Sequence, residues 1–371
     1  MHLDRNYYYG GNETALCLSE AEAWAERHAH EEEAAAFSHA SISKPTNDED
    51  VGTSTLGRDR AYSLALAPQL MYTRSNLIPA LVSSRTQSQI EFLAMGSWFV
   101  ASAASTLARL DRVPSSREDI FQDQTLNVKA KRSLVKFIRF VAQYEEQAEI
   151  WEEATSMSFP AFLEQKFSLP EASHAPLLAL TLTGGSLDHT TVEVALPRIA
   201  RHLRSIGLFG PGFGAVYPQF GGLSEVAQVA CRACAVGGGV YVLGKGVKTA
   251  TQDHDTDEVH LELSDGEKIL TNYLVGCADD LPPSQASIAK PTGSARPPTS
   301  RSISIVSSPL SSLFPLTAEG GVMPAGAVIV VPAAHSSELP VHVVAHSAAS
   351  GECPSGQCTY PHYLLHAILQ R

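Results

Sequence analysis

The sequence predicts a discontinuous α/β domain that carries a helical insert. Strand patterns occur near both ends of the chain, whereas the middle has the periodicity of helices. In addition, the opening segment 2–6 (HLDRN) has the pattern of the second strand of a dinucleotide-type βαβ unit, with Asp4 at its end. Because a run of helices between strand–helix elements forms a layer of its own, we expect three segments. They are 1–112 as the first part of domain I, 113–206 as a helical domain II, and 207–371 as the second part of domain I.

The glycine motif of a dinucleotide-type unit, G-x-G-x-x-G, precedes its second strand. No such motif occurs here in a strand–helix context. The segment 210–214 (GPGFG) contains a proline and follows no predicted strand, so we expect a loop there. We therefore expect the first βα unit to be missing, which would leave an unpaired strand in a parallel sheet and an uncovered apolar helix face.

The remaining elements of the first part of domain I follow from composition. Residues 17–36 are rich in Ala and Glu and predict a helix. Residues 38–58 are polar and poor in aromatic side chains, which predicts a disordered insertion. A helical pattern resumes at about 64–82.

The helical insert begins at the Val113-Pro114 boundary, and its longest predicted helix covers 129–151. Its apolar stripe consists of Leu134, Phe137, Ile138, Val141 and Tyr144, and a basic stripe of Lys129, Arg132, Lys136 and Arg139 lies nearly opposite. Such a basic face is usually solvated. However, Phe121 precedes it in a polar segment, and an aromatic residue combined with arginine is typical of a protein interface. Shorter helices are predicted at 159–167, 175–182 and 192–206.

The second part of domain I contains a helix of small residues at 222–238, on which Glu225, Gln228 and Arg232 share one stripe. Glu225 and Arg232 are two turns apart, about 10 Å along the axis, which is too far for the usual ion pair between adjacent turns. The stripe is therefore either a solvated edge or a surface that recognises a partner. Strands are predicted at 240–243, 260–263, 269–275, 303–306, 327–331 and 341–345, with a Pro/Ser-rich linker at about 281–300.

Composition limits the class of function. The 371 residues carry a net charge of −12, which argues against a nucleic-acid or anionic-membrane surface and favours basic partners. The N-terminus has no apolar signal region, and no apolar run approaches the roughly 18 residues of a membrane span. Six cysteines without a secretory signal predict free thiols in a reducing compartment.

Candidate metal and catalytic groups are few. Cys231 and Cys234 lie on the predicted helix, where thiols at this spacing are usually packing residues, and Cys353 and Cys358 lie in a turn. The four together have the ligand types of a zinc site, but the two pairs are far apart in sequence, which argues against one. His342 and His346 have the spacing of an HExxH motif, but Val343 replaces the glutamate in a strand pattern. We expect no metal and no catalytic residue.

Three blocks resemble the Rab GDP-dissociation inhibitor and Rab escort protein superfamily: DRNYYYGG at 4–11, RAYSLALAPQLMYTRSNLIPALVSS at 60–84, and YPQFGGLSEVAQVACRACAVGGGVYVL at 217–243. The resemblance extends in patches to about residue 359 and is most specific in the third block. It implies a flavoprotein-monooxygenase-like fold of the FAD/NAD(P)-binding type, without a cofactor. It also implies a protein that binds GDP-loaded Rab GTPases and shields their geranylgeranyl lipid. The last residues, 360–371, do not resemble the family's C-terminal region, so we expect the chain to be truncated at both ends.

Within that superfamily, Phe121 and Arg132 have the spacing with which escort proteins contact the α subunit of Rab geranylgeranyltransferase, in the matching context IFQDQTLNVKAKRSLVKF. The insertion at 38–58 and the segment 300–315 also resemble fungal escort proteins. The resemblance implies a non-catalytic accessory subunit that presents unprenylated Rabs to the transferase and delivers prenylated Rabs to membranes. It further implies a cytoplasmic protein with transient membrane contact. A dissociation inhibitor that only recycles prenylated Rabs is the alternative, and an FAD-dependent oxidoreductase, which would need the missing glycine motif, is a more distant one.

The resemblance also implies which residues touch the GTPase. Tyr9, Glu225 and Arg232 match Rab-binding positions, and Val242 stands where the family often has methionine. The family's GELPQ motif is SEVAQ here, so Gln228 is kept while the proline is not. Candidates for lining a prenyl groove are Phe137, Val141, Leu177 and Leu178, which fit an ordinary hydrophobic core equally well.

Overall fold

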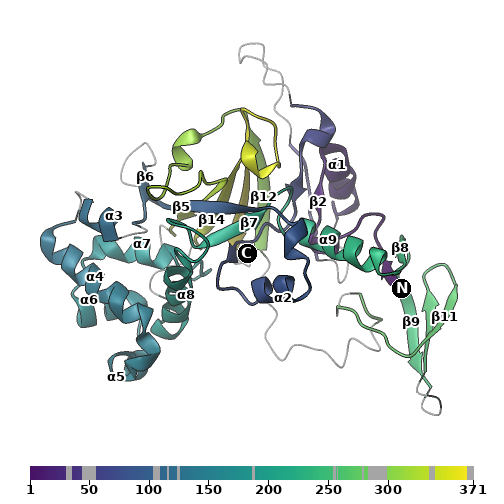
Figure 1. The fold of residues 1–371 in the computed structure, drawn as a ribbon, viewed down its shortest axis with the longest axis horizontal. Coiled ribbons are helices and arrows are strands. Elements are labelled where there is room, and N and C mark those ends of the chain that lie inside the picture. The colour runs from purple at the N-terminus through teal and green to yellow at the C-terminus, as the bar shows by residue number, and fades with distance from the viewer. Residues whose placement is uncertain are drawn as a thin grey trace. The chain divides into compact units, whose positions relative to one another are not determined.

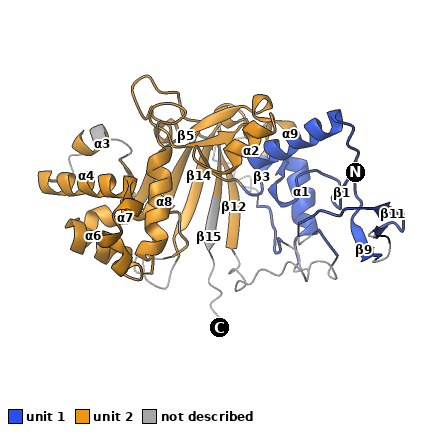
Figure 2. Ribbon diagram, turned by 60° about the horizontal axis from the view of Figure 1, so that its bottom comes forward, with its two compact units in different colours: residues 1–53, 64–67, 221–296 blue, residues 54–63, 68–220, 297–371 orange. Residues whose placement is uncertain are grey.

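In a computed structural model, the described part of the chain falls into two compact units (Figures 1 and 2). The first comprises residues 1–53, 64–67 and 221–296, and the second comprises 54–63, 68–220 and 297–371. The described residues are 1–30, 36–43, 56–102, 109–114, 117–122, 126–185, 189–253, 256, 258–277, 280–282, 299–333 and 339–365. Much of the expected insertion at 38–58 and of the linker at 281–300 lies outside them. The three-segment division expected from the sequence stays a prediction.

The second unit is built on a mixed sheet that has eight strands among the described residues. Its strand order is β12 (Thr299–Val306), β15 (Cys358–Leu365), β14 (Val341–Ser347), β13 (Gly326–Val331), β5 (Phe92–Ser102), β7 (Ala215–Pro218) and β4 (Met71–Tyr72), with β6 (Arg109–Arg112) also paired to β5. The pairing of β13 with β5 is parallel, and the other pairings are antiparallel.

Side chains on this sheet alternate between two apolar layers because successive residues of a strand point to opposite faces. On β5, Trp98 and Val100 belong to the larger core cluster, and Phe99 belongs to the smaller one on the other face. On β13, Val328 and Ile329 divide in the same way. Both faces of the central strands are therefore covered.

The helical block packs on one face of this sheet (Figure 2). Its helices are α3 (Arg117–Gln122), α4 (Val128–Ala142), α5 (Ala148–Trp151), α6 (Phe159–Phe167), α7 (His174–Ala179) and α8 (Val192–Ser205), and a further helix of the unit is α2 (Leu77–Ser83). The Asn127 side chain accepts a hydrogen bond from the Ala130 backbone N–H at 2.9 Å and so caps the start of α4. The predicted apolar stripe is confirmed in part: Leu134, Phe137 and Val141 are buried on α4 and Ile138 is half-buried, whereas Tyr144 is buried but lies beyond the end of the helix.

Among its described residues, the first unit contains smaller sheets and two α-helices. β1 (His2–Asp4) pairs in parallel with β8 (Tyr241–Leu243), and β2 (Ala15–Leu16) pairs antiparallel with β3 (Leu64–Ala65). An antiparallel sheet of β9 (Val247–Gln252), β10 (Val259–Leu263) and β11 (Lys268–Thr271) follows β8. The helices are α1 (Leu18–Arg27) and α9 (Leu223–Val236). Among the described residues, no helix has both the length and the apolar character that crossing a bilayer requires.

Three predicted helices were wrong in extent. The helix expected at 17–36 ends at Arg27, where His28 leaves the helical conformation with φ −104° and ψ 18°, and 31–35 lie outside the described residues. The segment 64–82 forms β3 and β4 before α2 begins at Leu77, because strand pairing and Pro68 override its helical pattern. The long helix expected at 129–151 stops at Ala142, since Gln143 adopts φ −142°. The Trp151 indole N–H then donates to the Tyr144 carbonyl at 2.9 Å, which ties α5 to this break.

Candidate functional site

Five residues of the first unit form the main candidate surface, and we call them the platform residues: Tyr9, Glu225, Gln228, Arg232 and Val242. Three of them are carried by α9, which begins after Gly222 and buries only Ser224 and Val229. Gln228 and Arg232 are exposed, and Glu225 is half-buried. Because these three positions are separated by one and two helical turns, the structure confirms that they share one face of α9.

The two platform charges stay separate. In the part of the chain that the structure describes, no ion pair joins Glu225 to Arg232. Burial raises the pKa of the Glu225 carboxyl, and the positive charge of Arg232 opposes that rise. The two groups therefore influence each other through space, and each keeps its hydrogen-bonding capacity for a partner.

Tyr9 packs against two aromatic side chains, His2 at the start of β1 and Tyr241 at the start of β8. Its ring lies edge-on to His2 at 5.2 Å and to Tyr241 at 5.5 Å, while His2 stacks on Tyr241 at 4.8 Å. The Thr14 hydroxyl donates to the Tyr9 carbonyl oxygen at 3.0 Å, and Gly10 adopts φ +106°, which a side chain would disfavour. Burial raises the pKa of the Tyr9 hydroxyl, so this group is a hydrogen-bond donor at neutral pH.

Val242 lies on β8 opposite Leu3 of β1 and is half-buried. Its neighbour Tyr241 was not singled out from the sequence, although it supports Tyr9 directly. The pKa of the Tyr241 hydroxyl is raised, first by the nearby Cys234 thiol and then by burial. Tyr241 could have been identified only from the parallel pairing of β1 with β8, which places it beside His2. The sequence does not show that pairing, because the two strands are far apart along the chain.

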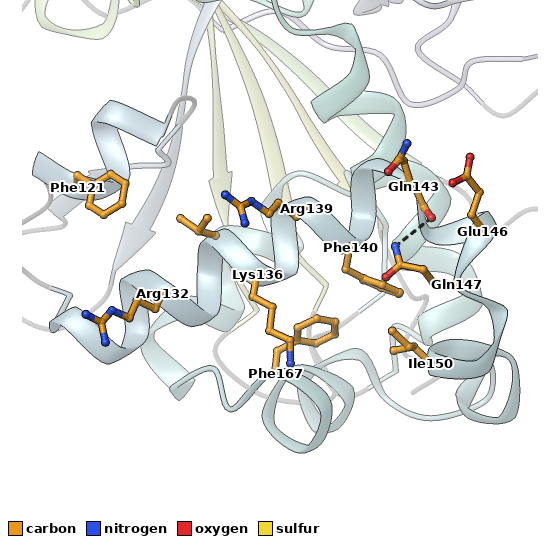
Figure 3. Close-up of a pocket in the computed structure, with 11 residues that line it drawn as sticks. Phe121, Arg132, Lys136, Arg139, Phe140, Gln143, Glu146, Gln147, Ile150 and Phe167 are labelled. Atoms are coloured by element: carbon orange, nitrogen blue, oxygen red, sulfur yellow. Dashed lines mark hydrogen bonds between the residues drawn. The ribbon is translucent and has the colours of Figure 1, made fainter.

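A second candidate surface is an open groove of about 760 Å³ in the helical block, and we call it the α4 groove (Figure 3). Phe121 on α3 and Arg132 on α4 both line it. Phe121 is 58% exposed, and α3 is fixed to α4 by a 2.7 Å hydrogen bond from the Lys131 ammonium to the Phe121 carbonyl. The groove therefore presents an aromatic ring near an exposed guanidinium group.

The rest of the α4 groove combines positive charge with apolar area. Lys136 and Arg139 line it together with Arg132, and the Lys136 ammonium lies 5.6 Å from the centre of the Phe167 ring. Phe140 and Ile150 add apolar area. The sequence did not single out Phe140 or Phe167 for this role, although Phe140 follows Lys136 by one helical turn.

The candidate prenyl-lining residues belong to the core of the helical block. Phe137 and Val141 are fully buried, and Leu177 and Leu178 are nearly so. Of the two interpretations left open by the sequence, the structure supports the hydrophobic core.

The remaining candidate groups were the thiols and histidines. Cys231 and Cys234 lie on α9 of the first unit, whereas Cys353 and Cys358 are buried in the second. His342 and His346 lie on a strand, β14, as expected. No group of three or more metal-binding side chains occurs among the residues that the structure describes.

Comparison with known proteins adds a family and a fold. A family model described as "GDP dissociation inhibitor" matches residues 1–313. The Saccharomyces cerevisiae protein "Rab proteins geranylgeranyltransferase component A" is 29% identical over 247 residues, which cover 66% of this chain and 39% of the relative. The Drosophila melanogaster protein of the same name is 28% identical over 321 residues, covering 84% of this chain and 60% of the relative.

Two solved structures share the fold. A Rab GDI from Plasmodium falciparum superposes with a TM-score of 0.66 at 19% identity, covering 99% of this chain and 77% of the other. An oxidoreductase from Methanosarcina mazei superposes with a TM-score of 0.53 at 12% identity, covering 99% and 73%. These likenesses confirm the predicted α/β fold class. The chain spans 39% of the yeast relative's length and 60% of the fly relative's.

Proposed function

The chain belongs to the GDP dissociation inhibitor family, and we propose that it is an escort protein for Rab GTPases. In this role it presents GDP-bound, unprenylated Rabs to Rab geranylgeranyltransferase and delivers the prenylated products to membranes. The observation that carries the proposal is the family match over residues 1–313, together with curated relatives that are named component A of this transferase.

The platform residues are the proposed contact with the GTPase. Arg232 and Glu225 present opposite charges without pairing each other, and Tyr9 adds a hydroxyl held by the His2–Tyr241 group. Such a polar patch can distinguish nucleotide states, because the switch segments of a GTPase are ordered differently with GTP and with GDP. Val242 adds an apolar contact at the edge of the patch.

The proposed role is non-catalytic, since presenting and delivering a substrate require complementary surfaces rather than groups that break bonds. Shielding the geranylgeranyl lipid requires apolar surface, and each methylene removed from water contributes about 0.8 kcal/mol. We assign the lipid to the helical block and transient membrane contact to the loaded complex, in a cytoplasmic protein.

The α4 groove is the proposed docking site for the transferase α subunit. Phe121 would supply the aromatic contact and Arg132 the charged one, and both line the same groove. A dissociation inhibitor that recycles prenylated Rabs is the alternative, and it would leave the groove unused. The likeness to an oxidoreductase concerns the fold alone, and no observation favours that activity.

The test is replacement of Phe121 by Ala, with Phe209→Ala as the matched control. Phe209 is also a phenylalanine of the second unit, is 51% exposed, and lies outside the α4 groove. Loss of a central aromatic contact should weaken transferase binding by about 2 kcal/mol or more, while Rab binding stays unchanged. Both associations are measured by pull-down with purified Rab and the α subunit. Equal loss of the two partners in Phe121→Ala, or loss of the transferase in Phe209→Ala, would contradict the assignment.

A further inference from the structure

The helix α4 concentrates positive charge in a protein whose net charge is −12. It carries five cationic residues and no acidic residue between Val128 and Ala142. Four of the five form the basic stripe predicted from the sequence, and we call them the α4 stripe: Lys129, Arg132, Lys136 and Arg139. Their spacing of three, four and three residues places them on one face of the helix, over about 15 Å of its length. All four side chains are exposed.

The α4 stripe is not neutralised inside the protein. In the part of the chain that the structure describes, no carboxylate forms an ion pair with any of its four cations. Asp119 of α3 pairs with Arg112 at 3.7 Å. Glu145, just beyond the end of α4, pairs with Arg204 of α8. The positive charge of the stripe is therefore available to a partner outside the molecule.

Exposed apolar side chains lie where the α4 stripe begins. Phe121 on α3 is 58% exposed, and Val128, the first residue of α4, is 65% exposed. The hydrogen bond from the Lys131 ammonium to the Phe121 carbonyl holds the end of α3 beside the start of α4. We call this region the α3–α4 corner. Exposed apolar groups beside several Lys and Arg side chains are typical of a segment that binds the interface of an anionic bilayer.

The opposite end of the same surface is acidic. Figure 3 shows Phe121 and Arg132 toward one end of the α4 groove and Glu146 toward the other. Three more glutamates follow Glu146 in the chain, and all four are exposed: Glu146, Glu149, Glu152 and Glu153. An anionic surface attracts the cationic end and repels the acidic end. It therefore selects one orientation of the helical block, with the α3–α4 corner toward the lipid.

The negative net charge of the whole chain does not oppose such a contact. At physiological ionic strength the Debye length is about 8 Å, so a charged surface responds to the side chains close to it. A cluster of roughly four to eight Lys or Arg residues on an amphipathic helix is typical of binding to anionic phospholipid, and each one strengthens binding by roughly fivefold. α4 has five such residues, and its apolar face is buried in the core of the helical block.

We propose that the α4 stripe, together with Phe121 and Val128, is a docking site for the surface of a bilayer that contains anionic phospholipid. The headgroup chemistry is a phosphate group with a net negative charge, as in phosphatidylserine. Long Lys and Arg side chains reach such headgroups while their methylene groups cover apolar surface. Because the site consists only of side chains of this chain, it binds the bilayer with or without a prenylated cargo.

One consequence rests on the proposed function. Phe121 and Arg132 are also the proposed contacts with the transferase α subunit. A side chain that is covered by the transferase cannot reach a bilayer, so the two partners exclude each other. The transferase must then leave before the escort protein docks on a membrane.

Co-sedimentation with lipid vesicles tests the docking site in the full chain. The vesicles consist of phosphatidylcholine alone or of phosphatidylcholine mixed with phosphatidylserine, at low and at high salt. The variant is Arg132→Gln/Arg139→Gln. Its matched control is Arg58→Gln/Arg60→Gln, which removes two exposed arginines of the same unit outside α4. A thermal melt of each protein verifies that it is folded.

We expect the unaltered chain and the control to bind the phosphatidylserine vesicles alone, and high salt to release them because it screens the charges. Arg132→Gln/Arg139→Gln should weaken binding by about 25-fold, which is about fivefold for each cation. Lys129→Gln, at a stripe residue that does not line the α4 groove, should weaken binding by about fivefold.

Three results would overturn the docking site: no binding to the phosphatidylserine vesicles, equal binding to both kinds of vesicle, or equal loss in Arg132→Gln/Arg139→Gln and in its control. Purified α subunit should release the chain from the vesicles, and a stable assembly of vesicle, chain and α subunit would contradict the mutual exclusion. An α subunit that does not bind the chain in solution would instead contradict the proposed function. In that case the vesicle measurements still decide the docking site.

Discussion

Arg232 and Glu225 share one face of α9 without an ion pair, which leaves both charges available to a partner. Exposed charges that serve only solvation contribute little to binding or stability, and removing them has small effects. A charge at the centre of an interface behaves differently, because its loss leaves a partner group desolvated and unpaired. Mutation therefore separates the two interpretations of this stripe.

Arg232→Ala should weaken the affinity for GDP-loaded Rab by about 1.5–3 kcal/mol, the range of a hydrogen bond to a charged group. Lys268→Ala is the control, since Lys268 is an exposed cation of the same unit on β11. Isothermal titration calorimetry on both variants measures the difference. If the two variants bind alike, the stripe is a solvated edge.

His202 of α8 is a buried group with a consequence for pH. Its ring lies 4.8 Å from Trp98 and 5.9 Å from Tyr72, and burial lowers its pKa from 6.5 to about 4. Between these two values the unfolded chain binds a proton that the folded chain excludes. Stability should therefore be unaffected by this group above about pH 6.5 and fall as the pH drops toward 4.

Replacing His202 by Phe should remove the uptake of about one proton on unfolding in this pH range. Between pH 6.5 and about 4, the unaltered chain should therefore lose about 3 kcal/mol more of its free energy of unfolding than the variant does. Urea unfolding at several pH values measures the free energy of unfolding. His260→Phe, at an exposed histidine of β10, should keep the slope of the unaltered chain. Identical slopes in all three proteins would show that folding does not lower the pKa of His202.

The sequence singled out individual site residues only where a motif carried them. Phe121 and Arg132 were singled out by a spacing of eleven residues, and both line the α4 groove, while their contact with a partner stays a prediction. Tyr241 was not found, because its contact with Tyr9 depends on the parallel pairing of β1 with β8. That pairing joins segments that are far apart in the sequence, and no local pattern indicates it.

At the scale of elements, the α4 groove depends mainly on α4. This helix carries four of the residues that line the groove, Arg132, Lys136, Arg139 and Phe140. Its first turn depends on Asn127, whose side chain satisfies the Ala130 N–H. Asn127→Ala should lower the free energy of unfolding by about 1 kcal/mol, and Asn127→Ser should recover most of it. Thermal or urea unfolding of the two variants checks this, and equal loss in both would argue against a capping role.

Elements with a single clear period were predicted well. The helix expected at 159–167 coincides with α6, and the helix expected at 192–206 ends one residue later than α8. β5 was missed because Phe92–Ser102 is apolar on both faces and shows no alternation. The error at 64–82 has another cause, since its short strands are stabilised by partners far away in sequence.

At the scale of the whole molecule, a buried carboxylate connects distant parts of the second unit. Glu352 accepts hydrogen bonds from the Tyr217 hydroxyl at 2.5 Å and the Thr359 hydroxyl at 2.9 Å, and it pairs with His346 at 2.5 Å. These partners come from β7, β15 and β14. A buried polar group is stable only when its hydrogen bonds are satisfied, so Glu352 requires all three strands at once.

The sheet of the second unit could not be predicted from the sequence, because it depends on pairing between strands that are far apart along the chain. The fold class followed from the order of strands and helices and from three family-like blocks, whereas the sheet of the second unit joins strands from 71–72 to 358–365. The two proposed binding surfaces belong to different units. The platform residues belong to the first unit, and the α4 groove belongs to the second.

The most direct test of the central claim is the affinity of this chain for one Rab GTPase loaded with GDP and with a non-hydrolysable GTP analogue. The sample is first shown to be folded by a cooperative thermal transition. We predict saturable binding to the GDP form and affinity for the GTP form that is weaker by about tenfold or more, because the switch segments differ between the two states. Absence of binding to either form, or equal affinity for both, would contradict the account.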